Sequence, residues 1–161
     1  MEKPKFVYVT YIHTTPEKLW AALTQPEFTR QYWFDSSIES DWKPGGPIRF
    51  RRDGHINHDQ IVLQCEPPRR LAYTWHPIFD EEMRSERPSR VTLQIDPMGE
   101  AGGTGSQVVR LTVTHDDFAP NSVVFPGISE GWPAVLSNLK SLLESGHALP
   151  MNWKKCGSQA E

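Results

Sequence analysis

The chain has few cysteines, no long apolar run and no excess of charge of one sign. Its 161 residues include two cysteines, Cys65 and Cys156, which lie far apart and match no metal-binding or redox spacing. Two isolated cysteines are typical of a reducing compartment, so we expect free thiols and a cytoplasmic location. The net charge is -3, from 17 basic and 20 acidic residues, and it gives no electrostatic reason to expect nucleic acid as a partner.

Several targeting and catalytic motifs are also missing. No stretch approaches the length needed to span a bilayer, and the first residues lack the apolar core of a signal peptide. The sequence contains no GxSxG nucleophile elbow and no glycine-rich phosphate loop between a strand and a helix. No histidine or cysteine group has the spacing of a metal site. We therefore expect neither a metal nor a cofactor.

The clearest amphipathic stretch runs from Ser129 to Ser145. Its large apolar residues are spaced by one or three positions and share one helical face: Trp132, Val135, Leu136, Leu139, Leu142 and Leu143. The polar Asn138 is expected to lie off that face. Gly146 favours the left-handed conformation that closes a helix, and Pro133 is tolerated in a first turn. The pattern predicts a long helix that begins close to Gly131.

The preceding residues predict one strand, two short helices and then about six strands. The strand covers 6–13, and Thr15 and Pro16 are typical of a helix start, so a short helix should reach about Leu23. A second helix should follow Pro26. The later strands are expected at 37–42, 48–52, 58–66, 71–75, 91–95 and 108–115, with a charged loop at 77–89 and a hairpin tip at 97–107.

Strands joined by short turns pair antiparallel, so the fold class is α+β. We expect a curved antiparallel sheet of about seven strands wrapped around the C-terminal helix. Residues 1–146 should form a single domain, and residues 147–161 a loosely ordered tail.

Six segments occur in an order that is familiar from one family. They are TPEKLWAALTQPEFTRQYWF, DWKPGG, EPPRRLAYTWHP, SRVTLQID, RLTVTHDDF, and GW followed by NLKSLLESG. The chain resembles, from about Phe6 to Gly146, the family named after the activator of the 90-kDa heat-shock protein ATPase. This family belongs to the START-like, birch-pollen-allergen-like superfamily of helix-grip proteins. The resemblance implies a seven-stranded sheet that grips a long C-terminal helix, with a cavity between them.

The aromatic residues provide candidate walls for that cavity. The ligand-binding candidates are Trp33, Phe34, Phe50, Tyr73, Trp75, Phe125, Trp132 and Leu136. Taken singly, each could simply fill the core, but the resemblance favours a group that lines a cavity. Because others in the superfamily bind lipids, hormones or polyketides, we expect a small apolar or amphipathic molecule as the partner.

Histidines offer the alternative of an enzyme. His76 and His115 end two strands, where each could lie at a cavity rim near Asp116 or Asp117 and act as a general base in a cyclase- or hydrolase-like reaction. The simpler interpretation is a hydrogen-bonded histidine at a strand end. His55 and His58 flank a turn and are expected to form a chance surface pair.

Two kinds of protein partner are also considered, one implied by the resemblance and one by the residues. The family name suggests a chaperone-associated stress protein, although the namesake carries an additional N-terminal chaperone-binding domain that this chain is too short to contain. An exposed strand edge or the stretch from Met151 to Trp153 could support a homodimer.

Overall fold

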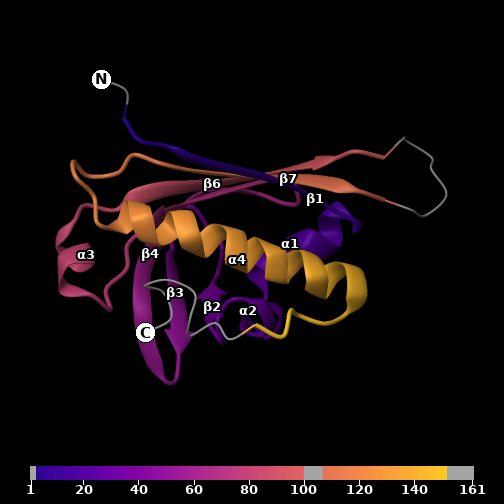
Figure 1. Ribbon diagram of the computed structural model, residues 1–161, viewed down its shortest axis with the longest axis horizontal. Coiled ribbons are helices and arrows are strands. Elements are labelled where there is room, and N and C mark those ends of the chain that lie inside the picture. Colours follow the sequence, from indigo (N-terminus) through magenta and orange to yellow (C-terminus); the bar gives the residue numbers. More distant parts are fainter. Residues whose placement is uncertain (1–2, 100–106, 152–161) are drawn as a thin grey trace.

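The computed structural model describes residues 3–99 and 107–151. Seven antiparallel strands form one sheet in the order β1-β7-β6-β5-β4-β3-β2 (Figure 1). The strands are β1 (Phe6–Ile12), β2 (Ser37–Ser40), β3 (Pro47–Arg52), β4 (His55–Glu66), β5 (Arg70–Trp75), β6 (Ser89–Pro97) and β7 (Val109–Asp116). The sheet twists strongly, so that β3 and β4 run across the direction of β1, β6 and β7 in Figure 1. The predicted α+β helix-grip architecture is confirmed.

The long helix α4 (Val124–Ser145) lies along the concave side of the sheet (Figure 1). It begins at Val124, so the prediction of a start close to Gly131 is wrong. Val124 and Ile128 continue the buried face upstream, and this burial stabilises a helix that contains Pro133 beyond its first turn. Gly146 has a φ of 85° and closes α4 in the left-handed conformation, as predicted.

Two short helices follow β1, and Gln25 separates them because Pro26 begins the second helix. In α1 (Pro16–Thr24), the Thr15 side chain accepts a hydrogen bond from the Lys18 amide, which confirms the predicted cap. In α2 (Pro26–Tyr32), the buried Tyr32 hydroxyl donates to the Ala22 carbonyl at 2.7 Å and ties α2 to α1. These helices bring the residues that follow Tyr32 to the interior.

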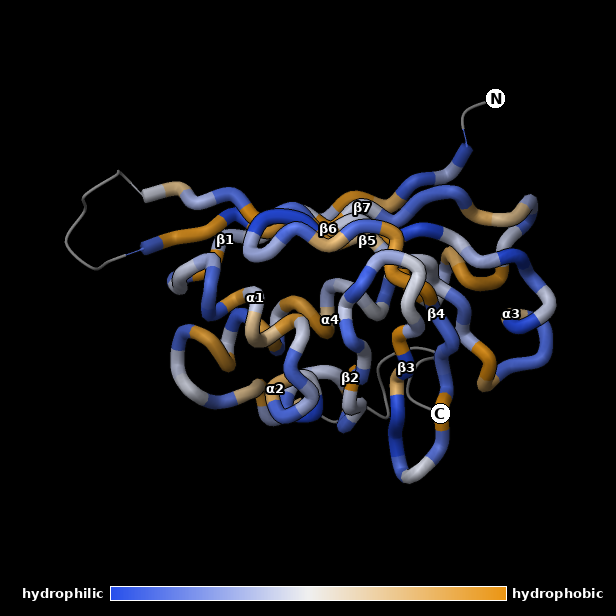
Figure 2. The backbone as a smooth tube through the Cα atoms, turned by 180° about the vertical axis from the view of Figure 1, so that it is seen from behind, coloured by the Kyte–Doolittle hydropathy of each residue, from blue (hydrophilic) through white to orange (hydrophobic). Residues whose placement is uncertain are grey.

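Buried and exposed side chains alternate along β6 and β7, as their sequence predicts. In Figure 2 the apolar residues of these strands alternate with polar ones along the tube. The phase of β4 is less obvious from its sequence. His58, Gln60 and Val62 face inward, whereas Ile61 and Leu63 are 48% and 46% exposed. The register shift between Val62 and Gln64 comes after these inward residues, and beyond it Gln64 and Cys65 are both half-buried.

Two polar segments are more ordered than the sequence suggests. The charged loop contains a short helix that the sequence analysis did not predict, α3 (Glu81–Ser85), in which the Asp80 carboxylate accepts from the Met83 amide. Asn138 is buried on α4, contrary to its expected place off the apolar face, and it hydrogen-bonds the Tyr32 carbonyl and the Leu149 amide. The amide side chain therefore fastens α2 and the segment after α4 to the helix.

Two further predictions fall largely on residues that the structure does not describe. The hairpin tip at 97–107 lies largely outside the described residues, as does the tail beyond Met151. Among the helices in 3–99 and 107–151, none combines the length and apolar character needed to cross a bilayer.

Candidate functional site

Aromatic rings from the sheet, from α4 and from the turn after α2 meet in the interior. Trp75 lies at the centre, with its ring centroid 5.5 Å from Trp132, 5.6 Å from Phe50 and 6.3 Å from Trp33. Trp33 is also in edge contact with Phe50 at 5.2 Å and with Trp132 at 5.3 Å. Tyr73 approaches Trp75 at 6.4 Å. We call Trp33, Phe50, Tyr73, Trp75 and Trp132 the aromatic cluster.

The other predicted binding residues lie around this cluster. Phe34 and Leu136 are buried, with 5% and 1% of their surface exposed. Phe125 is partly buried and reaches the cluster indirectly, since its ring contacts Phe118 at 5.0 Å and Phe118 stacks on His115 at 4.7 Å. The fold thus brings the predicted residues to one region between the sheet and α4.

The space between the sheet and α4 is largely filled by these side chains. A void of about 10 Å³ remains, lined by Trp33, Trp75, Gly131, Trp132 and Val135. That volume is close to the minimum needed for one water molecule. The aromatic rings therefore occupy the space that the resemblance assigned to a cavity, and a larger molecule could enter only if some rings moved.

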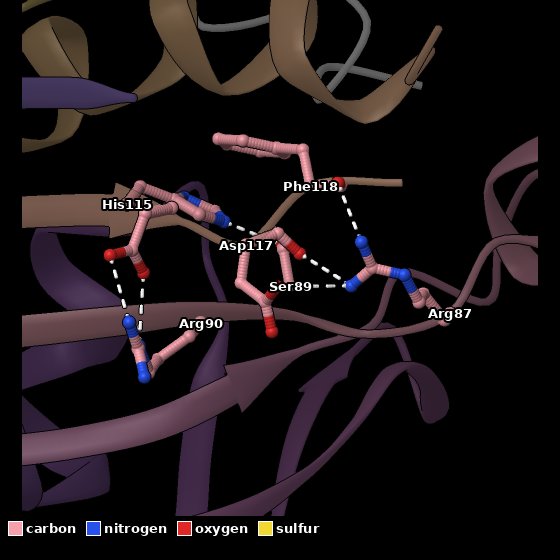
Figure 3. Close-up of polar contacts among 7 residues, drawn as sticks. Arg87, Ser89, Arg90, His115, Asp117 and Phe118 are labelled. Atoms are coloured by element: carbon pink, nitrogen blue, oxygen red, sulfur yellow. Dashed lines mark hydrogen bonds and ion pairs between the residues drawn. The ribbon is translucent and has the colours of Figure 1, made fainter. Parts of the chain in front are cut away.

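His115 lies inside the protein, not at a rim, and takes part in a buried hydrogen-bond chain, of which Figure 3 shows the contact with Ser89. The Trp132 indole N–H donates to His115 Nδ1 at 3.0 Å, and His115 Nε2 lies 2.7 Å from Ser89 Oγ. Because Nδ1 accepts, Nε2 carries the proton and donates to Ser89. Burial lowers the pKa of His115 to about 3, although Asp116 opposes the shift. Neither ring nitrogen is free to accept a proton, so this arrangement supplies no general base at His115.

The two aspartates near His115 are held by arginines (Figure 3). Arg90 binds Asp116 through two hydrogen bonds of 3.0 and 2.9 Å. Arg87 donates to the Asp117 carbonyl and carboxylate and to the Phe118 carbonyl, at 3.0, 3.2 and 2.9 Å. Asp117 has a φ of 59°, so Arg87 fixes a left-handed turn that places Phe118 against His115. These contacts are structural, and the His115 ring is hydrogen-bonded to Ser89 and Trp132 and not to either carboxylate.

His58 is buried against the aromatic cluster, so the expectation of a surface pair with His55 is wrong. Its ring lies 4.8 Å from both Phe50 and Trp75, with 4% of its surface exposed. Burial, then the charges of Arg52 and His76, lower its pKa to about 3. Sequence reasoning also missed Gln60, which is fully buried two residues further along β4. A hint was available, because the apolar run from Ile61 to Leu63 does not define which face of the strand is buried.

The remaining candidates do not assemble into a second site. His76 Nε2 donates to the Arg84 carbonyl at 2.9 Å, which links the end of β5 to α3. Within 3–99 and 107–151, no three histidine, cysteine or acidic residues come together as metal ligands would. A hollow of about 590 Å³ lies on the outer face of the sheet, but it is open and polar, and its Arg70 and Arg90 are already hydrogen-bonded to neighbouring side chains.

Comparison with known families places this geometry in context. Residues 13–144 match the family described as activator of Hsp90 ATPase homolog 1-like protein, which is most of the chain. The chain belongs to this family. A curated relative, isoleucine–tRNA ligase from Desulforudis audaxviator, is 30% identical over 131 residues, which cover 77% of this chain. The match spans only 13% of the length of that ligase.

Several solved structures have a similar fold. A protein from Mesorhizobium loti is 28% identical, with a TM-score of 0.70, and the match covers 87% of this chain and 96% of that one. An HSP90 activator from Plasmodium falciparum has 20% identity and a TM-score of 0.69, over 86% and 95% of the two chains. The Aha1 dimer from Colwellia psychrerythraea has 20% identity and a TM-score of 0.67, over 89% and 98%. The last two similarities show the shared fold alone.

Proposed function

We propose that the chain binds a small apolar or amphipathic molecule between the sheet and α4, within the aromatic cluster. The observation that carries this proposal is the convergence of three tryptophans of the aromatic cluster, Trp33, Trp75 and Trp132, on the void beside Gly131 and Val135. Aromatic walls bind apolar molecules through the area that they remove from water, and small-molecule pockets are lined mainly by apolar and aromatic side chains. Membership of the family is consistent with such a function.

The wall formed by Trp33 is the one that would move to admit a ligand. Trp33 follows the last residue of α2, and Phe34 and Asp35 have left-handed φ values of 49° and 59°. Such values are unfavourable for residues other than glycine, and the cost is of order 1–3 kcal/mol each at strained positions. The Trp33 backbone is held by two hydrogen bonds of 2.8 Å, from its amide to the Thr29 carbonyl and from the Ser36 amide to its carbonyl, so the part that moves is the side chain. Rotation of Trp33 would widen the void without disturbing the sheet.

The proposal can be tested by titrating the protein with toluene and following the indole N–H signals in proton–nitrogen NMR spectra. We expect saturable shifts of the Trp33, Trp75 and Trp132 signals, because these rings border the void. The Val135→Phe variant would fill the same space and should weaken toluene binding at least about tenfold, as overpacking a site excludes its ligand. Absence of saturable binding in the native chain would refute the proposal.

A matched control is available on the same helix. Ser137 lies on the exposed side of α4, so Ser137→Phe adds the same ring without reaching the void. Toluene affinity in this variant should equal that of the native chain. If both substitutions weaken binding equally, the ligand does not occupy the aromatic cluster.

A chaperone-linked role is the second candidate function, and the family name and the HSP90 activator of the same fold favour it. The structure points to no particular docking residue for a chaperone. Two experiments test this role. The chain should co-purify with the 90-kDa heat-shock protein from a cell extract, and it should stimulate the ATPase rate of that heat-shock protein. If neither effect is seen, the candidate loses its support.

A homodimer is a further proposal about partners, motivated by the Aha1 dimer of similar fold. The strand β1 ends the sheet, and its Val7, Val9 and Tyr11 are each about half exposed in one row. An unpaired apolar edge favours association with a second copy. Light scattering should report twice the monomer mass for the native chain and the monomer mass for Val9→Lys. A monomeric native chain would exclude the dimer.

A cytoplasmic location stays a prediction.

A further inference from the structure

Three buried polar atoms beside the aromatic cluster have no hydrogen-bond partner. Among the side chains in residues 3–99 and 107–151, these atoms are His58 Nε2, Gln60 Nε2 and Trp75 Nε1. Their residues are 4%, 0% and 2% exposed, so solvent does not reach them. Burying such a group without a partner costs about 1–3 kcal/mol. Three such groups in one region are unusual in a core whose only role is to stabilise the fold.

The three side chains are neighbours on the inner face of two paired strands. His58 and Gln60 are two residues apart on β4, and successive inward residues lie on the same face of a strand. Gln60 Oε1 accepts from the amide of His76, the residue next to Trp75 on β5, at 3.3 Å. The His58 and Trp75 rings are 4.8 Å apart, and Trp75 also lines the void. The unpartnered atoms therefore lie in one region, which Trp75 connects to the void.

The hydrogen-bonding roles of these atoms can be assigned. His58 Nδ1 lies 3.0 Å from Asn57 Oδ1, which can only accept, so Nδ1 carries the proton and Nε2 offers a lone pair. The Gln60 amide nitrogen donates because Oε1 is the atom that accepts from His76. The Trp75 indole nitrogen can only donate. The site offers one acceptor and two donors.

A hydroxyl group complements this set, since it has one hydrogen to donate and two lone pairs to accept. A ketone or a carboxylate could satisfy the two donors but would leave His58 Nε2 without a donor. An ammonium group could serve His58 only. No Asp, Glu, Lys or Arg side chain in the described part of the chain is fully buried, so the interior holds no charge to pair with an ionised ligand. Arg52, whose charge helps to lower the pKa of His58, is partly exposed.

We propose that the ligand bound in the aromatic cluster carries a neutral hydroxyl group, an alcohol or a phenol, which donates to His58 Nε2 and accepts from Gln60 Nε2 and Trp75 Nε1. This inference rests on the proposed function and specifies the chemical class of its ligand. The apolar body of the molecule lies against Trp33 and Trp132, where the void is. Trp75 contacts both parts, because it borders the void and carries one of the donors.

The test compares three probes that share one aromatic ring and differ in a single substituent: phenol, toluene and benzoate. Each is titrated into the native chain and followed by NMR of the indole N–H signals. We expect phenol to bind at least about tenfold more tightly than toluene, as the net gain from additional hydrogen bonds to buried groups suggests. Benzoate should bind more weakly than phenol. The Trp75 indole N–H signal should move further with phenol than with toluene.

Variants then connect the preference to the named atoms. In Gln60→Leu and in His58→Phe the ratio of phenol to toluene affinity should fall at least about threefold, while toluene affinity changes little, because each substitution removes one hydrogen bond to the hydroxyl. His55→Phe is the matched control, since His55 is exposed at the start of β4 and should leave the ratio unchanged. If one of the core variants does not fold, the other variant and the Trp75 signal still give an answer.

The outcomes separate this inference from the function on which it rests. If none of the three probes binds, the interior is not a binding site and both proposals are wrong. If toluene binds as tightly as phenol, or if both core variants keep the native ratio, the site exists but the hydroxyl assignment is wrong. If benzoate binds most tightly, Arg52 and not the three unpartnered atoms determines selectivity.

Discussion

Mild acid should destabilise this protein through two buried histidines. His58 and His115 are both neutral in the folded chain, each with a pKa lowered to about 3, mainly because burial disfavours the charged ring. In the unfolded chain both rings return to water and to the ordinary value of 6.5. The unfolded state therefore binds more protons than the folded state throughout the interval between these values.

The sign and size of the effect follow from this difference. The contribution of each histidine is fully present above pH 6.5, declines as the pH falls below that value, and is lost completely by about pH 3. At pH 5 the free energy of unfolding should be lower than at pH 7.5 by about 2 kcal/mol for each histidine, or about 4 kcal/mol for both. This figure hardly changes if a folded pKa is one unit higher, because pH 5 still lies above it. Since small domains are stable by about 5–15 kcal/mol, the loss should be easy to measure.

Urea unfolding followed by tryptophan fluorescence at pH 7.5 and pH 5 measures this change. In His58→Phe and in His115→Gln the difference between the two pH values should shrink by about 2 kcal/mol. Comparing pH values within each variant cancels the packing lost by the substitution itself. His55→Gln removes an exposed histidine that loses little water on folding, and it should keep the full native difference. A native chain whose stability is the same at both pH values would refute the burial argument, as would core variants that keep the whole difference.

Three other predictions concern stability. Gln60→Leu should raise the free energy of unfolding by about 1 kcal/mol in urea, because removing a buried unpartnered amide outweighs the 3.3 Å bond to His76; Gln64→Leu, whose amide is paired with Glu66, should give no gain. Tyr32→Phe should lower the free energy of unfolding by about 1–3 kcal/mol, since the Ala22 carbonyl loses its 2.7 Å bond from the hydroxyl. The control is Tyr8→Phe, which removes the hydroxyl of a partly buried tyrosine on β1. Asn138→Ala should speed hydrogen exchange at the Leu149 amide, which the Asn138 side chain accepts from at 2.6 Å, and unchanged exchange would mean that other contacts hold this segment.

Much of the fold could be predicted because local patterns there agree with the final structure. Thr15 and Pro16 define the start of α1 through capping and backbone geometry that involve only neighbouring residues. Asp53 and Gly54 both have positive φ values and form the tight turn between β3 and β4 that this pair predicts. Alternation along β7 places His115 on the same face as Val113, although the strand-end position suggested a rim.

Other features depend on tertiary context that the sequence does not display. On β4 the apolar run from Ile61 to Leu63 does not alternate in sequence, yet in the structure burial alternates along the strand, with His58 and Gln60 inward and Leu63 outward. The early start of α4 was hidden by Pro133, which is normally a sign of a helix start. Asn138 lies four residues before Leu142 on the buried face, and only its contacts with α2 and with Leu149 explain a polar residue there.

The buried polar atoms distinguish a binding core from a core that serves stability alone. A core selected only for stability would replace Gln60 with an apolar residue, because natural cores satisfy or remove such groups. If Gln60→Leu both stabilises the unliganded chain and reduces the preference for phenol over toluene, the Gln60 amide lowers the stability of the unliganded chain and strengthens ligand binding. If the substitution stabilises the chain and leaves the preference unchanged, the unpartnered amide is a cost of folding with no part in recognition. The two measurements together therefore test whether His58, Gln60 and Trp75 are retained for a ligand.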